Sequence, residues 1–106
     1  MSKNAYWRRK FEAQQPNVRD GEESFDYATS LDLLGHVHEL SVVEKTTYDL
    51  EGTDDALTID VMRTVATERV ATDWRIVLLG ENYRVFKIEV KPTSNRILRF
   101  FCRKGM

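Results

Sequence analysis

The stretch DWRIVLLGENYRVFKIEV, residues 73–90, carries the clearest structural signal in the sequence. Residues 74–79 are mostly β-branched, aromatic and aliphatic, which is typical of a strand covered on both faces. A turn is expected next, because glycine and asparagine tolerate the positive φ angles of tight hairpins; it comprises Gly80, Glu81 and Asn82. Residues 83–90 then alternate between apolar and polar side chains. The stretch therefore predicts a β-hairpin inside a sheet or a barrel wall.

Segments on both sides of this hairpin carry similar signals. Short strands at regular spacing, with turn residues between them, favour a small barrel or sandwich. No convincing long helix separates one strand from the next, so parallel βαβ units are not expected. We predict an all-β domain, a small antiparallel β-barrel or sandwich of about six strands that spans residues 1–106. The expected strands are residues 37–43, 58–65, 74–79, 83–90 and 96–103, with a sixth near the N-terminus, where residues 6–15 fit either a strand or a short helix.

Two connecting stretches are less clear. Residues 25–34 fit either a short helix or an irregular strand, and residues 66–73 are expected to form a polar connection. Alternation along the strands assigns the inward face. It places Val65 and Val90 inward, and it predicts a buried surface made by Ile76, Leu78, Phe86, Ile88, Leu98 and Phe100.

Composition limits the possible functions. The 16 basic and 17 acidic residues give a net charge of −1, so bulk charge predicts no nucleic-acid or membrane partner. The single cysteine, Cys102, fits a reducing compartment without an internal disulfide. On the expected apolar face it is a small hydrophobic side chain rather than a nucleophile. No apolar run of about 18 residues is present, and the basic N-terminus lacks the apolar segment of a secretory signal.

Charge is unevenly distributed along the chain. Residues 1–10 and 91–106 contain basic residues and no acidic ones, whereas residues 44–57 contain five acids and one base, Lys45. Residues 44–57 are too long for a tight hairpin turn, and loops of this length are usually functional or disordered. The simplest interpretation is a set of solvated faces. The alternative is that the two signs meet, within one subunit or between copies.

The residues that could carry chemistry do not form a recognised site. His36 and His38 share one strand face and could form part of a metal site, but a metal needs a third ligand. Asp32 or Glu39 could contribute, although no spacing requires it, and two partly exposed histidines at a subunit contact explain the pattern as well. We therefore expect no metal, no cofactor and no enzymatic activity.

Six segments, taken in order, resemble the bacteriophage head–tail joining family, also called head-closure, stopper or head–tail adaptor proteins. The order and spacing of the segments carry the resemblance, which covers most of the chain. In the family these positions hold an opening basic strand, a second strand, an alternating strand ending in Arg, a strand near Arg-Ile, a Gly-x-x-Tyr turn and a closing strand with a late Cys. Here they are residues 8–14, 35–39, 58–63, 72–76, 80–85 and 96–103.

The resemblance implies a structural virion protein at the head–tail interface, present in the host cytoplasm during assembly. Copies would form a homo-oligomeric ring, twelve-fold or alternatively six-fold, that lies below the portal and joins capsid to tail. A portal or adaptor protein would lie above the ring, and a tail terminator or tail-tube protein below. Genomic DNA would pass through the lumen without sequence recognition.

The resemblance also assigns candidate residues. In the family a long loop after the second strand projects into the DNA channel. Residues 44–57, folded back on themselves, would reach about 20 Å, and an acidic lining would let DNA slide. The channel-loop candidates are Glu44, Lys45, Tyr48, Asp49, Glu51, Gly52, Asp54 and Asp55. The candidates for contacts with other subunits, the portal or the tail are Arg8, Arg9, Lys10, His36, His38, Arg99, Arg103 and Lys104.

Two alternatives come from other classes. Residues 82–85 followed by residues 96–99 superficially resemble the closing strands of small ribonuclease toxins of toxin–antitoxin pairs. Those enzymes normally open with two amphipathic helices, and residues 1–57 show no helical period. The other alternative is a generic small β-barrel binding module.

Overall fold

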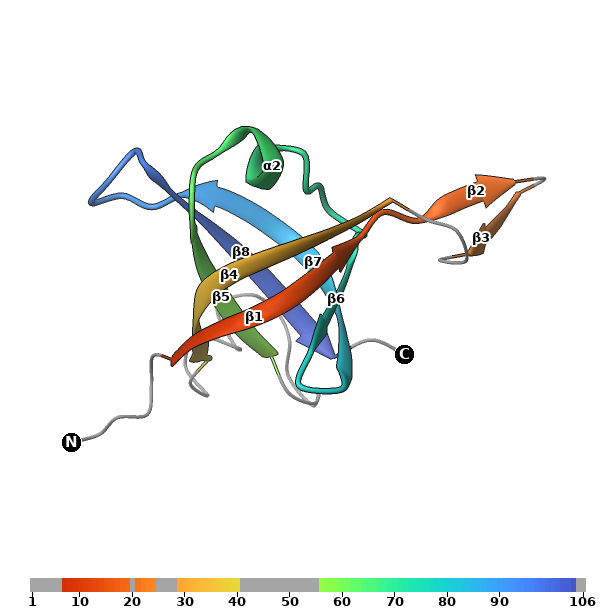
Figure 1. The fold of residues 1–106 in the computed structure, drawn as a ribbon, viewed down its shortest axis with the longest axis horizontal. Helices are drawn as coiled ribbons and strands as arrows, with labels where there is room; N and C mark the ends of the chain where they lie inside the picture. Colours follow the sequence, from red (N-terminus) through yellow and green to blue (C-terminus); the bar gives the residue numbers. More distant parts are fainter. Residues whose placement is uncertain (1–6, 20, 25–28, 41–55, 105–106) are drawn as a thin grey trace.

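The computed structural model describes residues 7–19, 21–24, 29–40 and 56–104, and within them the chain forms a closed antiparallel barrel of six strands (Figure 1). This confirms the predicted fold class and selects the barrel over the sandwich. Around the barrel the order is β1, β4, β5, β8, β7 and β6. The strand bounds in that order are Trp7–Gln14, Ser30–Glu39, Ala56–Met62, Ile97–Lys104, Glu81–Val90 and Arg75–Leu78.

The strand ladders differ greatly in length. β5 pairs with β8 over seven residue pairs, from Ala56↔Arg103 to Met62↔Ile97. By contrast, β4 pairs with β5 over four residue pairs, and β1 closes the barrel on β6 over three. Consequently β5, β8 and β7 form a continuous wall, while the β4–β5 and β1–β6 junctions are short.

The β6–β7 hairpin confirms the two expected strands but shifts the turn. Leu78 pairs with Glu81, so the turn consists of Leu79 and Gly80 alone, with φ angles of 52° and 79°. A two-residue hairpin of this kind needs positive φ at both positions. Glu81 and Asn82, expected in the turn, belong to β7 instead. The turn leaves the Leu79 side chain 67% exposed.

The barrel interior contains most of the predicted core. Ile76, Leu78, Leu98 and Phe100 are buried there together with Cys102, and Ile88 packs against them. The prediction for Phe86 was wrong. It packs instead against a separate cluster of Leu40 and Ala56, and its ring centroid lies 6.1 Å from that of Phe101.

A bulge in β7 explains the error at Phe86. Val85 pairs with Cys102, but the next paired residue of β7 is Lys87, so one residue is extra. An extra residue reverses the side-chain phase on one side of the bulge. Tyr83 and Val85 therefore point into the core before the bulge, and Ile88 does so after it.

A short helix replaces part of the connection expected at residues 66–73. α2 spans Val65–Glu68, and the Thr64 side chain caps it by accepting a hydrogen bond from the Thr67 backbone nitrogen. β5 consequently ends at Met62, and Val65, expected to point inward, is 84% exposed. Val90, also expected inward, is 41% exposed at the end of β7. No helix within the described residues is long and apolar enough to span a membrane.

Boundaries on the N-terminal side also differ from expectation. The ambiguous residues 25–34 become strand from Ser30 onward, and residues 25–28 lie outside the described residues. β5 begins at Ala56, so the last two residues of the expected loop, 44–57, belong to a buried strand.

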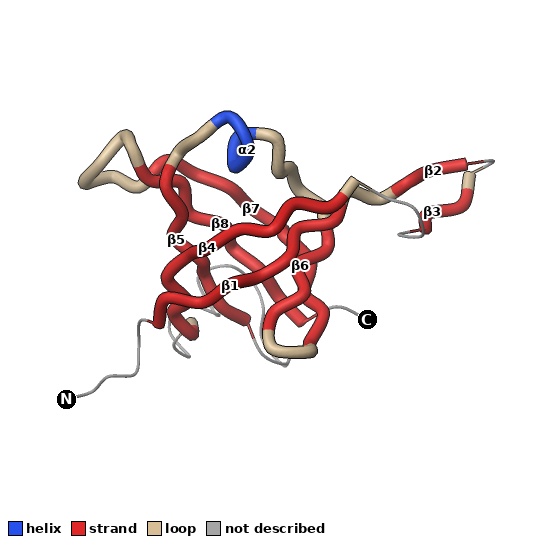
Figure 2. The backbone as a smooth tube through the Cα atoms, viewed as in Figure 1, coloured by secondary structure: helices blue, strands red, loops and turns tan. Residues whose placement is uncertain are grey.

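A second sheet projects from the barrel as a narrow arm (Figures 1 and 2). It consists of β2, Asn17–Arg19, and β3, Glu22–Ser24, paired antiparallel. At its base the Gln15 backbone nitrogen donates a hydrogen bond to the Thr29 carbonyl oxygen at 2.9 Å. We call residues 17–19 and 21–24 the arm.

The two phenylalanine environments predict different costs of truncation. Phe100→Ala should lower the free energy of unfolding by about 3–5 kcal/mol, because it leaves a cavity in the closed core. Phe86→Ala should cost less than half as much, because its side chain is only partly buried. Chemical denaturation of both variants would measure the difference. Equal losses would contradict the assignment of Phe86 to a separate cluster.

Candidate functional site

A cleft opens where β4 and β5 separate. Their ladder ends at His36↔Asp60, although both strands continue. Beyond this point residues 30–35 of β4 pair only with β1, and Val61 and Met62 of β5 pair only with β8. Figure 1 shows the two strands diverging toward α2. The cleft between them has a volume of about 900 Å³.

The walls of the cleft carry exposed apolar side chains. Leu34 on β4 is 41% exposed, and Met62 on β5 is 60% exposed. If the β4–β5 ladder continued in register by two residues, these two side chains would face each other across it. Ile97, which pairs with Met62, extends the apolar wall onto β8. The cleft thus presents apolar surface beside a strand edge that has no partner strand among the described residues.

A row of polar side chains crosses the strands at the end of the cleft. The register aligns Arg8 with His36, His36 with Asp60, and Asp60 with Arg99. Asp60 is only 7% exposed. It accepts hydrogen bonds from Arg99 Nε at 2.8 Å and Arg99 Nη2 at 3.1 Å, and Lys91 Nζ lies 3.4 Å from its Oδ2.

These contacts determine the ionisation of Asp60. Burial favours the neutral acid, but the hydrogen bonds from Arg99 and the positive charges of Arg99 and Lys91 outweigh it, and the pKa of Asp60 lies below its ordinary 3.8. The Asp60 carboxylate is therefore ionised, and its negative charge is already balanced by Arg99 and Lys91. It is a structural anchor between β5, β8 and the β7–β8 turn rather than an open reactive group.

Gly35 allows β4 to lie close against β5. A Cβ atom at this position would lie 2.6 Å from Ile59 Cγ2, and 2.9 Å from both the Asp60 carbonyl oxygen and Val61 Cγ1. No side chain fits there without movement of the neighbouring strand. Glycine inside a strand often marks such close approach, so the sequence contained the signal, although it did not single out Gly35.

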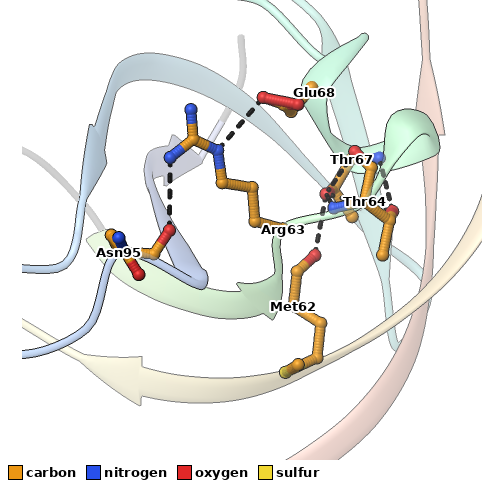
Figure 3. Close-up of polar contacts among 6 residues, drawn as sticks. All are labelled: Met62, Arg63, Thr64, Thr67, Glu68 and Asn95. Carbon is orange, nitrogen blue, oxygen red and sulfur yellow. Dashed lines mark hydrogen bonds and ion pairs between the residues drawn. The ribbon is translucent and has the colours of Figure 1, made fainter.

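The end of the cleft below α2 is held by a compact set of hydrogen bonds (Figure 3). Thr64 and Thr67 line the cleft, and Thr67 Oγ1 donates to the Met62 carbonyl oxygen at 2.8 Å. Arg63 connects the helix to the β7–β8 turn: its Nε lies 3.1 Å from Glu68 Oε2, and its Nη1 lies 3.2 Å from the Asn95 carbonyl oxygen. The backbone at Met62 and Arg63 is therefore connected both to α2 and to the β7–β8 turn.

The structure brings some of the predicted interface residues together at the cleft. Arg8 and His36 line it, and Lys10 borders the adjoining hollow beside Leu34. Arg9 is exposed on the same strand, and Arg99 supports the cleft through Asp60. The remaining candidates lie elsewhere: His38 is half-buried further along β4, Arg103 pairs with Ala56 on the strand ladder, and Lys104 forms an ion pair with Glu81.

The other sequence-predicted groups do not join this site. The channel-loop candidates Glu44, Lys45, Tyr48, Asp49, Glu51, Gly52, Asp54 and Asp55 lie outside the described residues. Cys102 is completely buried, and burial raises the pKa of its thiol, which keeps it protonated. In the part of the chain that the structure describes, no group of three or more His, Cys, Asp or Glu residues could hold a metal ion.

The close approach at Gly35 predicts a specific sensitivity. Gly35→Ala should lower the free energy of unfolding by about 1–3 kcal/mol, because the added methyl group overpacks the β4–β5 contact. Leu34→Ala, at the exposed neighbouring position, should cost less than about 1 kcal/mol and serves as the control. Urea denaturation would measure both. A Gly35→Ala variant as stable as the wild type would show that β4 moves freely at this point.

The ion pairs of Asp60 predict a pH-dependent contribution to stability. Because the folded pKa of Asp60 is lowered, the contribution is present above its ordinary pKa of 3.8 and is lost as pH falls through the folded pKa. Asp60→Asn should cost about 1–3 kcal/mol near pH 7, and the difference from wild type should shrink below about pH 4. Urea denaturation across this range, with the exposed Asp32→Asn as control, would measure it. A difference that stays constant down to about pH 2 would contradict this role.

Comparison of the chain with protein-family models, with curated proteins and with solved structures found no match. A function for this protein must therefore be inferred from its own residues. The features available for that inference are the closed barrel, the projecting arm and the cleft between β4 and β5.

Proposed function

We propose that the chain is a subunit of a head–tail connector ring, which joins a bacteriophage capsid to its tail and surrounds the DNA channel. One observation supports this most strongly. The six segments that resemble the head–tail joining family fall on the barrel strands or on the turns that join them, on β1, β4, β5, β6, β7 and β8. A resemblance produced by scattered short motifs would not be expected to follow the framework of one barrel.

The chemistry of the cleft favours protein contacts over bond-making. Its apolar walls include Leu34 and Met62, and its most buried acid, Asp60, is occupied by Arg99 and Lys91. Exposed apolar patches bordered by charges are typical of sites where proteins bind one another. A binding role of this kind suits a structural subunit, and it also suits the more general alternative of a small β-barrel binding module.

The distribution of charge is consistent with a DNA channel. The five acids of residues 44–57 would be repeated in every subunit of a ring of twelve or six copies. Basic linings hold DNA by releasing its counterions, so an acidic lining would allow the genome to slide without sequence recognition. The portal or an adaptor would bind one side of the ring and a tail protein the other, and the subunit would pass from the host cytoplasm into the virion.

Deletion of the gene from the phage or prophage genome that carries it tests this function. Without the connector subunit, capsids and tails should form separately, and negative-stain electron microscopy should show tailless heads and free tails. Supplying the wild-type chain from a plasmid should restore joined particles. Assembly of normal, infectious particles in the deletion strain would exclude the connector function and would leave the binding-module alternative.

A further inference from the structure

Within the described residues, the arm pairs with no strand of the barrel. Each of its strands is three residues long, and they pair only with each other. An isolated two-stranded hairpin is marginally stable in water. The contacts that tie it to the barrel include the Gln15–Thr29 hydrogen bond at its base and the ion pair between Glu23 and Arg84. An arm of this kind presents open strand edges that are suited to pairing with another chain.

The cleft has a strand edge and exposed apolar side chains that the arm could cover. Among the described residues, residues 30–35 of β4 have a partner strand on one side only, and the exposed Leu34 and Met62 flank the space where a further strand would lie. Addition of an extended segment to such an edge combines main-chain hydrogen bonds with apolar contacts. The cleft volume of about 900 Å³ is comparable to that of sites that hold sizeable ligands.

Charge complementarity also favours docking of the arm in the cleft. Glu22 on the arm is exposed, as is Arg8 at the cleft, and within the described chain neither forms an ion pair. The arm projects away from its own barrel (Figures 1 and 2), so its own cleft is not where it points. A second copy of the chain offers a cleft with the complementary charge.

We propose that the arm of one copy docks into the β4–β5 cleft of the next copy, with Glu22 beside Arg8. The arm adds to the open edge of β4 and covers Leu34 and Met62. Because arm and cleft are different surfaces, the contact is head-to-tail, and repetition of it builds a ring or a filament. The inference deepens the proposed function, on which its interpretation as a ring contact rests.

Sedimentation of the purified full-length chain over a range of concentrations tests this contact. The wild type should associate beyond a dimer as concentration rises. Glu22→Lys and Arg8→Glu should each weaken association about tenfold or more, because each places like charges together. The double variant Glu22→Lys, Arg8→Glu should recover most of the loss. Failure of the double variant to recover would overturn the pairing of these two residues.

Substitutions of apolar residues test the same contact independently. Met62→Asp should also weaken association about tenfold or more, whereas Leu79→Asp, which changes a similarly exposed side chain in the β6–β7 turn, should not. Equal effects of the two substitutions would overturn the cleft as the docking site. Circular dichroism before sedimentation would confirm that each variant is folded.

The outcome separates this inference from the proposed function. A wild-type chain that stays monomeric at every concentration overturns the arm–cleft contact between free copies. It does not remove the connector function, because a ring can assemble on a portal template, and the deletion experiment tests that function separately. Conversely, arm-dependent association together with normal particles in the deletion strain would support the contact and exclude the connector.

Discussion

Closure of the barrel depends on the short ladder between β1 and β6, which are the first and fourth of its strands in chain order. β1 meets β6 through three residue pairs, Glu12↔Val77 to Gln14↔Arg75, and these pairs convert an open sheet into a ring of strands. Residues 7–14 pair with β4 over their whole length on the other side. β1 and β4 therefore form a paired ribbon that meets β6 on one side and β5 on the other. Strands of a closed barrel tilt relative to its axis, and beyond His36 β4 follows β1 and no longer pairs with β5. The cleft lies where β4 leaves β5.

β5 accommodates this geometry because both of its faces are covered. Ile59 and Val61 point into the core, while Thr58 and Asp60 on the other face are also buried. Asp60 is the only acidic side chain among the buried residues that the structure describes, and the bidentate contact with Arg99 makes its burial tolerable. The same carboxylate contacts Lys91 in the β7–β8 turn. One buried acid thus fixes the wall that remains in place where β4 separates from it.

The sequence was sufficient to predict the strands whose side chains alternate simply between the two faces. It was insufficient where one extra residue reversed that alternation. β5, β6, β7 and β8 were predicted from apolar patterning, and the burial of Cys102 followed from its neighbours on β8. Phe86 could not be assigned correctly because a β-bulge has no reliable signature in one sequence, and one extra residue reverses the face. The cap of α2 was readable in principle, since Thr64 and Thr67 carry the capping hydrogen bonds. The cleft depends on strand divergence, a tertiary property, so its residues could be identified as exposed charges but not as one site.

The positions of arm and cleft constrain the symmetry of any assembly built from them. A two-fold dimer buries the same patch on both partners, whereas the arm joins the barrel between the end of β1 and the start of β4, and the cleft lies between β4 and β5. One contact leaves a free arm on one copy and a free cleft on the other, so assembly continues until the last arm reaches the first cleft. The number of copies is then set by the angle between arm and barrel. The described contacts that bear on this angle include the backbone hydrogen bond that Gln15 donates to Thr29 at the base of the arm and the ion pair of Glu23 with Arg84 on β7. Both contacts lie outside the hydrophobic core, so they would act on the geometry of such an assembly separately from the packing of the barrel.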